Sequence, residues 1–190
     1  MTRPFLYVMA AITLLAATGG AQAESFDSRE LMGGGPNFIA RAISPIPRTI
    51  VNFAGHYAPG TIVVNTAERR LYLVLPNGQA LRYGIGVGRD GFRWSGVHRV
   101  SAKKEWPSWT PPSQMLARRP DLPHYMRGGI DNPLGARAIY LGSTLYRIHG
   151  SNEPETIGQA VSSGCFRMTN DDVTDLYNRV SVGATVIVKN

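Results

Sequence analysis

The chain contains a single cysteine, Cys165, which follows a histidine, His149, by sixteen positions. A free thiol with a pKa of about 8.5 is mostly protonated at neutral pH, so a nucleophilic cysteine needs a base or a positive neighbour. His149 can take the thiol proton, and Arg167 can favour the thiolate. This spacing alone is a weak signal, because an isolated histidine is more often a hydrogen-bonded structural residue.

Gly164, directly before the cysteine, supplies a further feature of acyl transfer. Without a side chain it lets a substrate approach closely, and it leaves the backbone N–H groups of Gly164 and Cys165 free to face an oxyanion. Together with His149 these residues predict acyl transfer from an amide or ester carbonyl. The alternative is a buried, inert cysteine.

This stretch resembles the L,D-transpeptidase catalytic domain, also called the YkuD domain, of the ErfK/YbiS-like family. The family is marked by a His-Gly pair and a Ser-x-Gly-Cys-x-Arg segment, which match His149-Gly150 and residues 162–167 here. Other segments that look like the family are Asn152-Glu153-Pro154, residues 60–64, Arg70-Leu71-Tyr72 and residues 133–137. The resemblance covers about residues 59–190. Ser163 departs from it, because many members have histidine there, and this leaves the shape and polarity of the acceptor side open.

The resemblance implies roles for particular residues. Cys165 would be the nucleophile and His149 the base, and the Gly150 carbonyl would orient the imidazole. The N–H groups of Gly164 and Cys165 would line the oxyanion hole. Arg167 would order the site or meet a substrate carboxylate, with an internal salt bridge as the alternative. The further expected substrate contacts are Ser163, Asn152 and Tyr125.

The implied reaction is a ping-pong transfer on peptidoglycan tetrapeptide stems. A thioester forms on Cys165, the terminal D-alanine leaves, and an amine of another stem gives a 3→3 cross-link. Water as acceptor would give carboxypeptidase or endopeptidase activity, and a lysine of an outer-membrane lipoprotein would give its attachment to the wall. A non-catalytic wall-binding module is the second alternative. No metal or organic cofactor is expected, since the remaining histidines show no ligand spacing: His56, His98 and His124.

The pattern from residue 59 onward predicts a mainly β, single sandwich-like domain that positions these residues. Runs of β-branched residues and of alternating apolar and polar residues predict strands at 61–64, 70–75, 80–87, 97–105, 137–141, 145–149 and 185–188. The first of these form an antiparallel meander with a turn at Pro76-Asn77-Gly78. A short helix is expected after Thr169 or Asn170, with an apolar face at Val173, Leu176, Tyr177 and Val180.

Residues 106–136 contain six prolines, two tryptophans and Tyr125, which predict a long, proline-stiffened loop. Loops of this length inside a compact domain are usually functional or disordered, and the aromatic residues argue against disorder. We therefore expect a flap over the substrate, with an ordinary surface excursion as the alternative.

The N-terminus predicts export. Arg3, the apolar run 5–17 and the Ala21-Gln22-Ala23 site are typical of a signal peptide, here residues 1–23, and the run is too short to span a membrane. Residues 24–58 are expected to be a linker or N-terminal extension. The formal charge of +7 suits anionic surroundings, with solubility alone as the alternative. Without a Lys/Arg run or a known binding motif, nucleic acid is not an expected partner. The expected location is the periplasm or cell wall.

Overall fold

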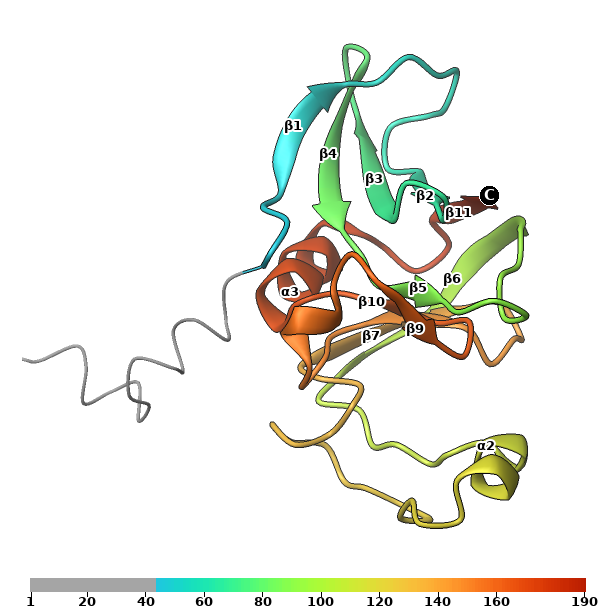
Figure 1. The fold of residues 1–190 in the computed structure, drawn as a ribbon. Helices are drawn as coiled ribbons and strands as arrows, with labels where there is room; N and C mark the ends of the chain where they lie inside the picture. Colours follow the sequence, from blue (N-terminus) through green and yellow to red (C-terminus); the bar gives the residue numbers. More distant parts are fainter. Residues whose placement is uncertain (1–43) are drawn as a thin grey trace, which may run out of the picture. The chain divides into compact units, whose positions relative to one another are not determined.

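The computed structural model describes residues 44–190 (Figure 1). The expected signal peptide and residues 24–43 of the expected linker lie outside the described residues. Within the described part, no helix is long and apolar enough to cross a membrane.

A nine-stranded sheet forms the body of the domain, in the order β1-β4-β3-β2-β11-β6-β7-β8-β10. Its strands are β1 (Thr49–Asn52), β2 (Ile62–Asn65), β3 (Arg70–Leu75), β4 (Gln79–Gly84), β6 (Gly96–Glu105), β7 (Arg137–Leu141), β8 (Arg147–His149), β10 (Phe166–Arg167) and β11 (Thr185–Lys189). β5 (Val87–Gly88) and β9 (Ala160–Ser162) form a second, two-stranded sheet. The helical elements are α2 (Ser113–Arg118), the 3-10 turn η1 (Pro154–Thr156) and α3 (Asn170–Arg179). The expected mainly β fold is confirmed.

The expected meander is present in β2, β3 and β4, which pair antiparallel. Asn77 and Gly78 both have positive φ, 60° and 69°, in the turn between β3 and β4. Asn and Gly tolerate this left-handed conformation best, and it matches the twist of a hairpin. The local sequence therefore determines this part of the sheet.

The long strand β6 belongs to both halves of the sheet. Its first residues pair with β11 and its later residues pair with β7, and the register shifts between Val100 and Ala102. A bulge of this kind bends a strand and increases its twist. The bend lets the sheet curl, so that in Figure 1 β1, β3 and β4 lie above and β7 and β10 lie below.

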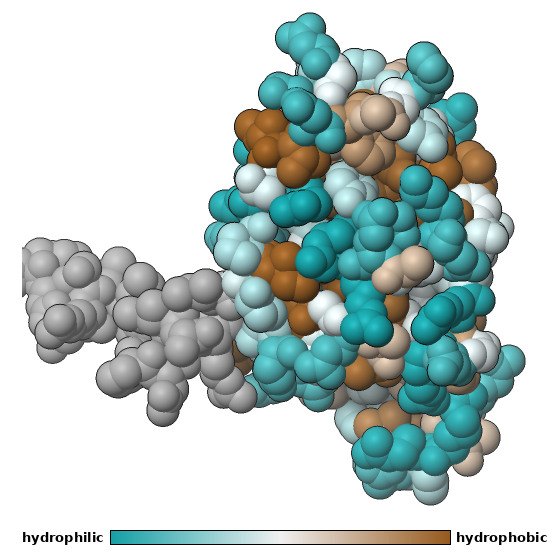
Figure 2. All heavy atoms as spheres, turned by 45° about the horizontal axis from the view of Figure 1, so that its top comes forward, coloured by the Kyte–Doolittle hydropathy of each residue, from teal (hydrophilic) through white to brown (hydrophobic). Residues whose placement is uncertain are grey.

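The core lies inside the curl. It includes Tyr83 from β4, Ile139 from β7 and Phe166 from β10, all of them at most 1% exposed. The expected apolar face of α3 joins this core through Val173 and Leu176. On the face seen in Figure 2, by contrast, hydrophobic residues occur as small patches among hydrophilic ones.

Helix α3 begins as expected. Thr169 is its N-cap, and the Thr169 hydroxyl accepts a hydrogen bond from the Asp172 N–H at 3.2 Å. This contact satisfies one of the N–H groups that the first turn leaves without an intrahelical partner. Because Thr169 follows β10 almost directly, the cap also fixes where the chain turns after the cysteine segment.

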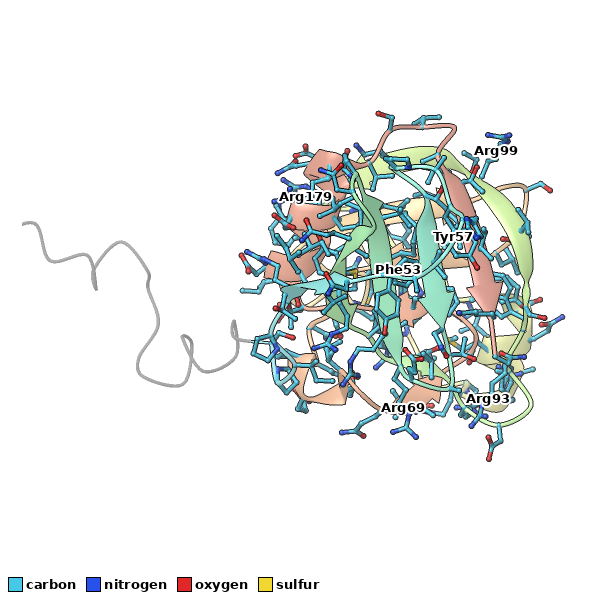
Figure 3. All side chains as sticks on the ribbon, turned by 90° about the horizontal axis from the view of Figure 1, so that it is seen from above. Phe53, Tyr57, Arg69, Arg93, Arg99 and Arg179 are labelled. Atoms are coloured by element: carbon cyan, nitrogen blue, oxygen red, sulfur yellow. The ribbon has the colours of Figure 1, made fainter. Side chains whose placement is uncertain are left out.

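Part of the expected linker or N-terminal extension packs on the domain. β1 pairs antiparallel with β4 at the edge of the sheet. The Arg48 guanidinium bonds Asp171 at 2.7 Å and Asp172 at 3.0 Å, at the first turn of α3. Ile46 packs so closely on Gly84 that a Cβ there would lie 2.5 Å from the Ile46 Cβ. The folded domain therefore begins before residue 49. Phe53 and Tyr57, labelled in Figure 3, continue it as an aromatic pair over the sheet.

The expected flap, residues 106–136, is not a loop throughout. It contains helix α2, and Trp109 and Met126 exchange two backbone hydrogen bonds of 2.8 Å. Near its base, Trp106 donates a backbone hydrogen bond to Ala136 at 2.8 Å. Below the sheet in Figure 1, the flap is therefore an ordered excursion whose two arms are joined.

Candidate active site

His149 ends β8 and is only 5% exposed. Its Nδ1 lies 2.6 Å from the Gly150 carbonyl oxygen. A carbonyl oxygen can only accept, so Nδ1 carries the proton and Nε2 has the free lone pair. The imidazole thus contacts the Gly150 carbonyl.

The surroundings of His149 keep its imidazole neutral. Burial lowers the pKa of His149 to about 3, and the positive charge of Arg167 acts in the same direction. The hydrogen bond to the Gly150 carbonyl opposes this shift only in part. At neutral pH the ring is an unprotonated base rather than a cation.

Gly150 is held by a tight arrangement around Asn170. The Asn170 Oδ1 accepts a hydrogen bond from the Ala136 N–H at 2.8 Å. A Cβ at Gly150 would collide with this Oδ1. The family-like His-Gly pair therefore has a steric reason: no side chain fits beside the carbonyl that orients His149.

Cys165 lies between β9 and β10 and is half-buried. Its Sγ lies 3.8 Å from the Leu145 carbonyl oxygen, which also accepts from Arg147 Nε at 3.3 Å and Arg147 Nη2 at 3.1 Å. Burial raises the pKa of the Cys165 thiol, while the charges of Arg147 and Arg167 act against this. In this conformation the thiol is the neutral form and donates toward Leu145.

The expected oxyanion hole needs correction at Gly164. The Gly164 N–H donates to the Ser162 hydroxyl oxygen at 3.1 Å, and that hydroxyl donates to the Cys165 carbonyl at 2.6 Å. The Gly164 N–H is therefore occupied and does not face the groove as a free donor. Within residues 44–190, the Cys165 N–H has no hydrogen-bond acceptor, so it is the one of the two expected donors that remains available.

Two aromatic residues that the sequence analysis missed hold this loop. The Trp94 indole N–H donates to the Gly164 carbonyl at 2.7 Å, and the Trp94 ring stacks on Tyr146 with centroids 4.4 Å apart. Gly164 has a φ of +106°, and a Cβ there would lie 2.6 Å from the Tyr146 ring. Nothing in the local spacing signals these contacts, because Trp94 lies seventy positions before Gly164.

A groove of about 940 Å³ brings Cys165 and His149 together with the flap. The flap residues along it include Trp109, Met115, Arg118, Leu122 and Met126. The expectation that the flap lies over a substrate site gains support from this lining. The thiol and the imidazole therefore face one space large enough for a peptide.

Of the other three expected substrate contacts, two line the groove. Ser163 and Asn152 line the groove, and Asn152 Nδ2 donates to the Asp131 carbonyl at 3.0 Å. Tyr125 is 60% exposed and is not among the residues that line the groove. Its neighbour Met126 points there instead.

Arg167 lines the groove but also forms an internal ion pair. Its Nη1 lies 2.7 Å from Glu153 Oε2 and 3.4 Å from the Thr156 hydroxyl. The structural salt bridge considered as the alternative is therefore present. Among the described residues, no cluster of three or more His, Cys, Asp or Glu could hold a metal ion.

The curled β-sheet, with a thiol and a neutral imidazole in one groove, defines a domain suited to cysteine-based acyl transfer. The family model described as the L,D-transpeptidase catalytic domain, YkuD, matches residues 59–188, and the chain belongs to this family.

Relatives and solved structures agree with this assignment, with one difference in description. The probable L,D-transpeptidase ErfK/SrfK of Escherichia coli is 42% identical over 134 residues, which are 66% of this chain but 42% of that protein. An L,D-transpeptidase structure from Mycobacterium smegmatis shares the fold at 18% identity, with a TM-score of 0.57 over 70% of this chain and 59% of that one. A Brucella melitensis structure, described as a probable carnitine operon oxidoreductase, is 46% identical with a TM-score of 0.52, over 78% of this chain and 98% of that one. The description of that structure differs from the family to which this chain belongs.

Proposed function

We propose that this domain is a peptidoglycan L,D-transpeptidase that works through a thioester on Cys165. The observation that carries the proposal is the neutral His149, whose Nδ1 is bound to the Gly150 carbonyl and which lines the same groove as the Cys165 thiol. Membership of the family supplies the reaction class. Because the matched region spans less than half the length of the Escherichia coli relatives ErfK/SrfK, YcfS and YbiS, the activity and substrates named here are proposals for this chain.

The first half-reaction would proceed as follows. The thiol turns from the Leu145 carbonyl, gives its proton to His149 Nε2, and its sulfur attacks the carbonyl at the L-centre of the third stem residue. The Cys165 N–H is the available donor toward the oxygen that becomes negative. The C–N bond to the terminal D-alanine then breaks, the departing amine takes the proton from His149, and a thioester remains.

The second half-reaction regenerates the thiol. The side-chain amine of another stem attacks the thioester and gives a proton to His149, the C–S bond breaks, and the sulfur recovers that proton. The product is a 3→3 cross-link. A buried neutral base suits both halves, because it can accept and return a proton without a permanent charge in the groove.

Incubation of the purified protein with a disaccharide-tetrapeptide tests this function. A cross-linked dimer by mass spectrometry, absent with Cys165→Ala, is the expected result. Release of D-alanine without dimer would identify a hydrolase, and transfer only to a lysine-terminated lipoprotein peptide would identify an anchoring enzyme.

Covalent trapping separates an enzyme from a wall-binding module. We expect a carbapenem to form a mass adduct with the protein and none with Cys165→Ala. No adduct, together with unchanged wall binding by that variant, would contradict the catalytic proposal.

We also propose that the protein is exported to the periplasm or cell wall and cleaved after Ala23. The support is the basic Arg3, the apolar run 5–17 and the small residues Ala21 and Ala23. N-terminal sequencing of the protein from a periplasmic fraction should begin at Glu24, and an intact N-terminus would contradict cleavage.

A further inference from the structure

Two arginines from separate elements contact the same aromatic ring. Arg89 directly follows β5, and Arg118 is in the last turn of α2 in the flap. Their guanidinium carbons lie 4.7 Å and 5.2 Å from the ring centroid of Phe92. All three residues line the groove, so this contact joins the flap to the loop between β5 and β6.

The charges of this pair are not balanced within the described residues. Over residues 44–190, neither Arg89 nor Arg118 forms an ion pair, whereas Arg119 bonds Asp121 at 2.6 Å and Arg167 bonds Glu153. An exposed cation–ring contact is worth only about 0.5–1 kcal/mol, and two like charges near one ring repel. An anion that contacts both guanidinium groups would remove the repulsion and accept charge-assisted hydrogen bonds.

Phe92 places this pair beside the cysteine loop. A Cβ at Gly88 would lie 2.5 Å from the Phe92 carbonyl oxygen, and a Cβ at Gly164 would lie 3.3 Å from the same atom. The main chain of Phe92 therefore packs against the residue that precedes Cys165. A group held by the two arginines would lie next to the loop that carries the thiol.

We propose that Arg89 and Arg118 form a carboxylate clamp for the stem peptide, and that the bound carboxylate draws the flap toward the loop between β5 and β6. The clamp rests on the proposed function and names the part of the substrate that this end of the groove recognises. A carboxylate fits because a guanidinium fork binds its two oxygens in a planar, bidentate manner. These residues bind and position; they take no part in proton transfer.

Equilibrium binding to the Cys165→Ala protein tests the clamp without chemistry. The two probes are a disaccharide-tetrapeptide and the same compound with its carboxyl groups converted to carboxamides. Arg89→Gln and Arg118→Gln should each weaken binding of the acid about tenfold, the usual effect of losing a charge-assisted hydrogen bond. Binding of the carboxamide should not change. The double variant should lose less than the two single losses multiplied, because both residues hold one group.

Two exposed arginines outside the groove lining serve as matched controls. Arg93, labelled in Figure 3, belongs to the same loop as Arg89 and pairs with Asp90 at 3.0 Å. Arg127 belongs to the flap. Arg93→Gln and Arg127→Gln should bind both probes as the parent does.

Hydrogen exchange tests the movement of the flap. The acid should slow amide exchange across residues 113–119, and the carboxamide should not. Exchange that the acid leaves unchanged would overturn the closing part of the proposal.

Three binding results would overturn the clamp itself. The first is a loss of affinity in Arg89→Gln and Arg118→Gln that is equal for the acid and the carboxamide. The second is a loss of affinity for the acid in the control variants as large as in the clamp variants. The third is no binding of either probe. The proposed function is tested separately, with the protein that keeps Cys165. If this protein yields neither dimer nor free D-alanine, the transpeptidase proposal is wrong. The clamp still stands if the clamp variants lose affinity for the acid alone.

Discussion

The charge state of His149 connects one side chain to the stability of the whole domain. Its pKa of about 3 lies below the ordinary value of 6.5. Below pH 6.5 the unfolded chain therefore binds a proton that the folded protein does not. The free energy of unfolding should fall as pH drops from 6.5 toward 3, by about 1.4 kcal/mol per pH unit from this group.

Urea unfolding of the wild type and His149→Gln at pH 7.5 and pH 5.0 checks this. The variant should lose less stability between the two pH values, because glutamine does not titrate. Equal losses in both proteins would show that His149 is protonated in the folded state.

The reactivity of Cys165 is set by opposing effects on the same atom. Burial raises the pKa of the thiol, and the Arg147 charge lowers it from beside the shared Leu145 carbonyl. Arg147→Gln should therefore raise the thiol pKa further and slow iodoacetamide alkylation several-fold at pH 7.5. The midpoint of the rate against pH should move upward, whereas Arg99→Gln, on β6 and outside the groove lining, should leave it in place. A midpoint unchanged by Arg147→Gln would contradict this role.

At the scale of elements, Trp94 ties the loop before Cys165 to the sheet. Trp94→Phe keeps an aromatic ring against Tyr146 but removes the indole hydrogen bond to the Gly164 carbonyl. We expect a loss of about 1 kcal/mol in stability and slower carbapenem acylation, because the loop is less well fixed. Trp106→Phe is the control, since Trp106 is 47% exposed and its indole forms no hydrogen bond within the described residues. Equal acylation rates in both variants would contradict a positioning role.

Elements also differ in how far their sequences determine them. Strands β3 and β7 have the expected bounds because their apolar alternation and flanking turns are local. The parallel pairings of β2 with β11 and of β8 with β10 join segments far apart in the chain. Such pairings depend on how the whole chain closes, so alternation alone does not specify them.

At the scale of the whole molecule, β1 completes the sheet edge that residues 59–190 leave open. A chain that starts at residue 44 should be more stable to urea than one that starts at residue 54, which lacks β1 and the Arg48 contacts to α3. Arg48→Ala should fall between them, because it removes the ion pairs and keeps the strand. Equal unfolding midpoints for the two truncated chains would show that β1 adds nothing.

The sequence by itself determined the mainly β class and the cap and face of α3, which follow from short-range patterns of alternation and capping residues. It also indicated that His149 and Cys165 share one site, through motifs that resemble the family. Only the tertiary structure decided that Ser162 occupies the Gly164 N–H, that Trp94 holds the loop, and that Arg89 and Arg118 contact the same ring, that of Phe92. The Trp94 and arginine contacts join residues far apart in the chain, and the Ser162 bond depends on how the loop before Cys165 closes. No spacing in the chain encodes such contacts before it folds.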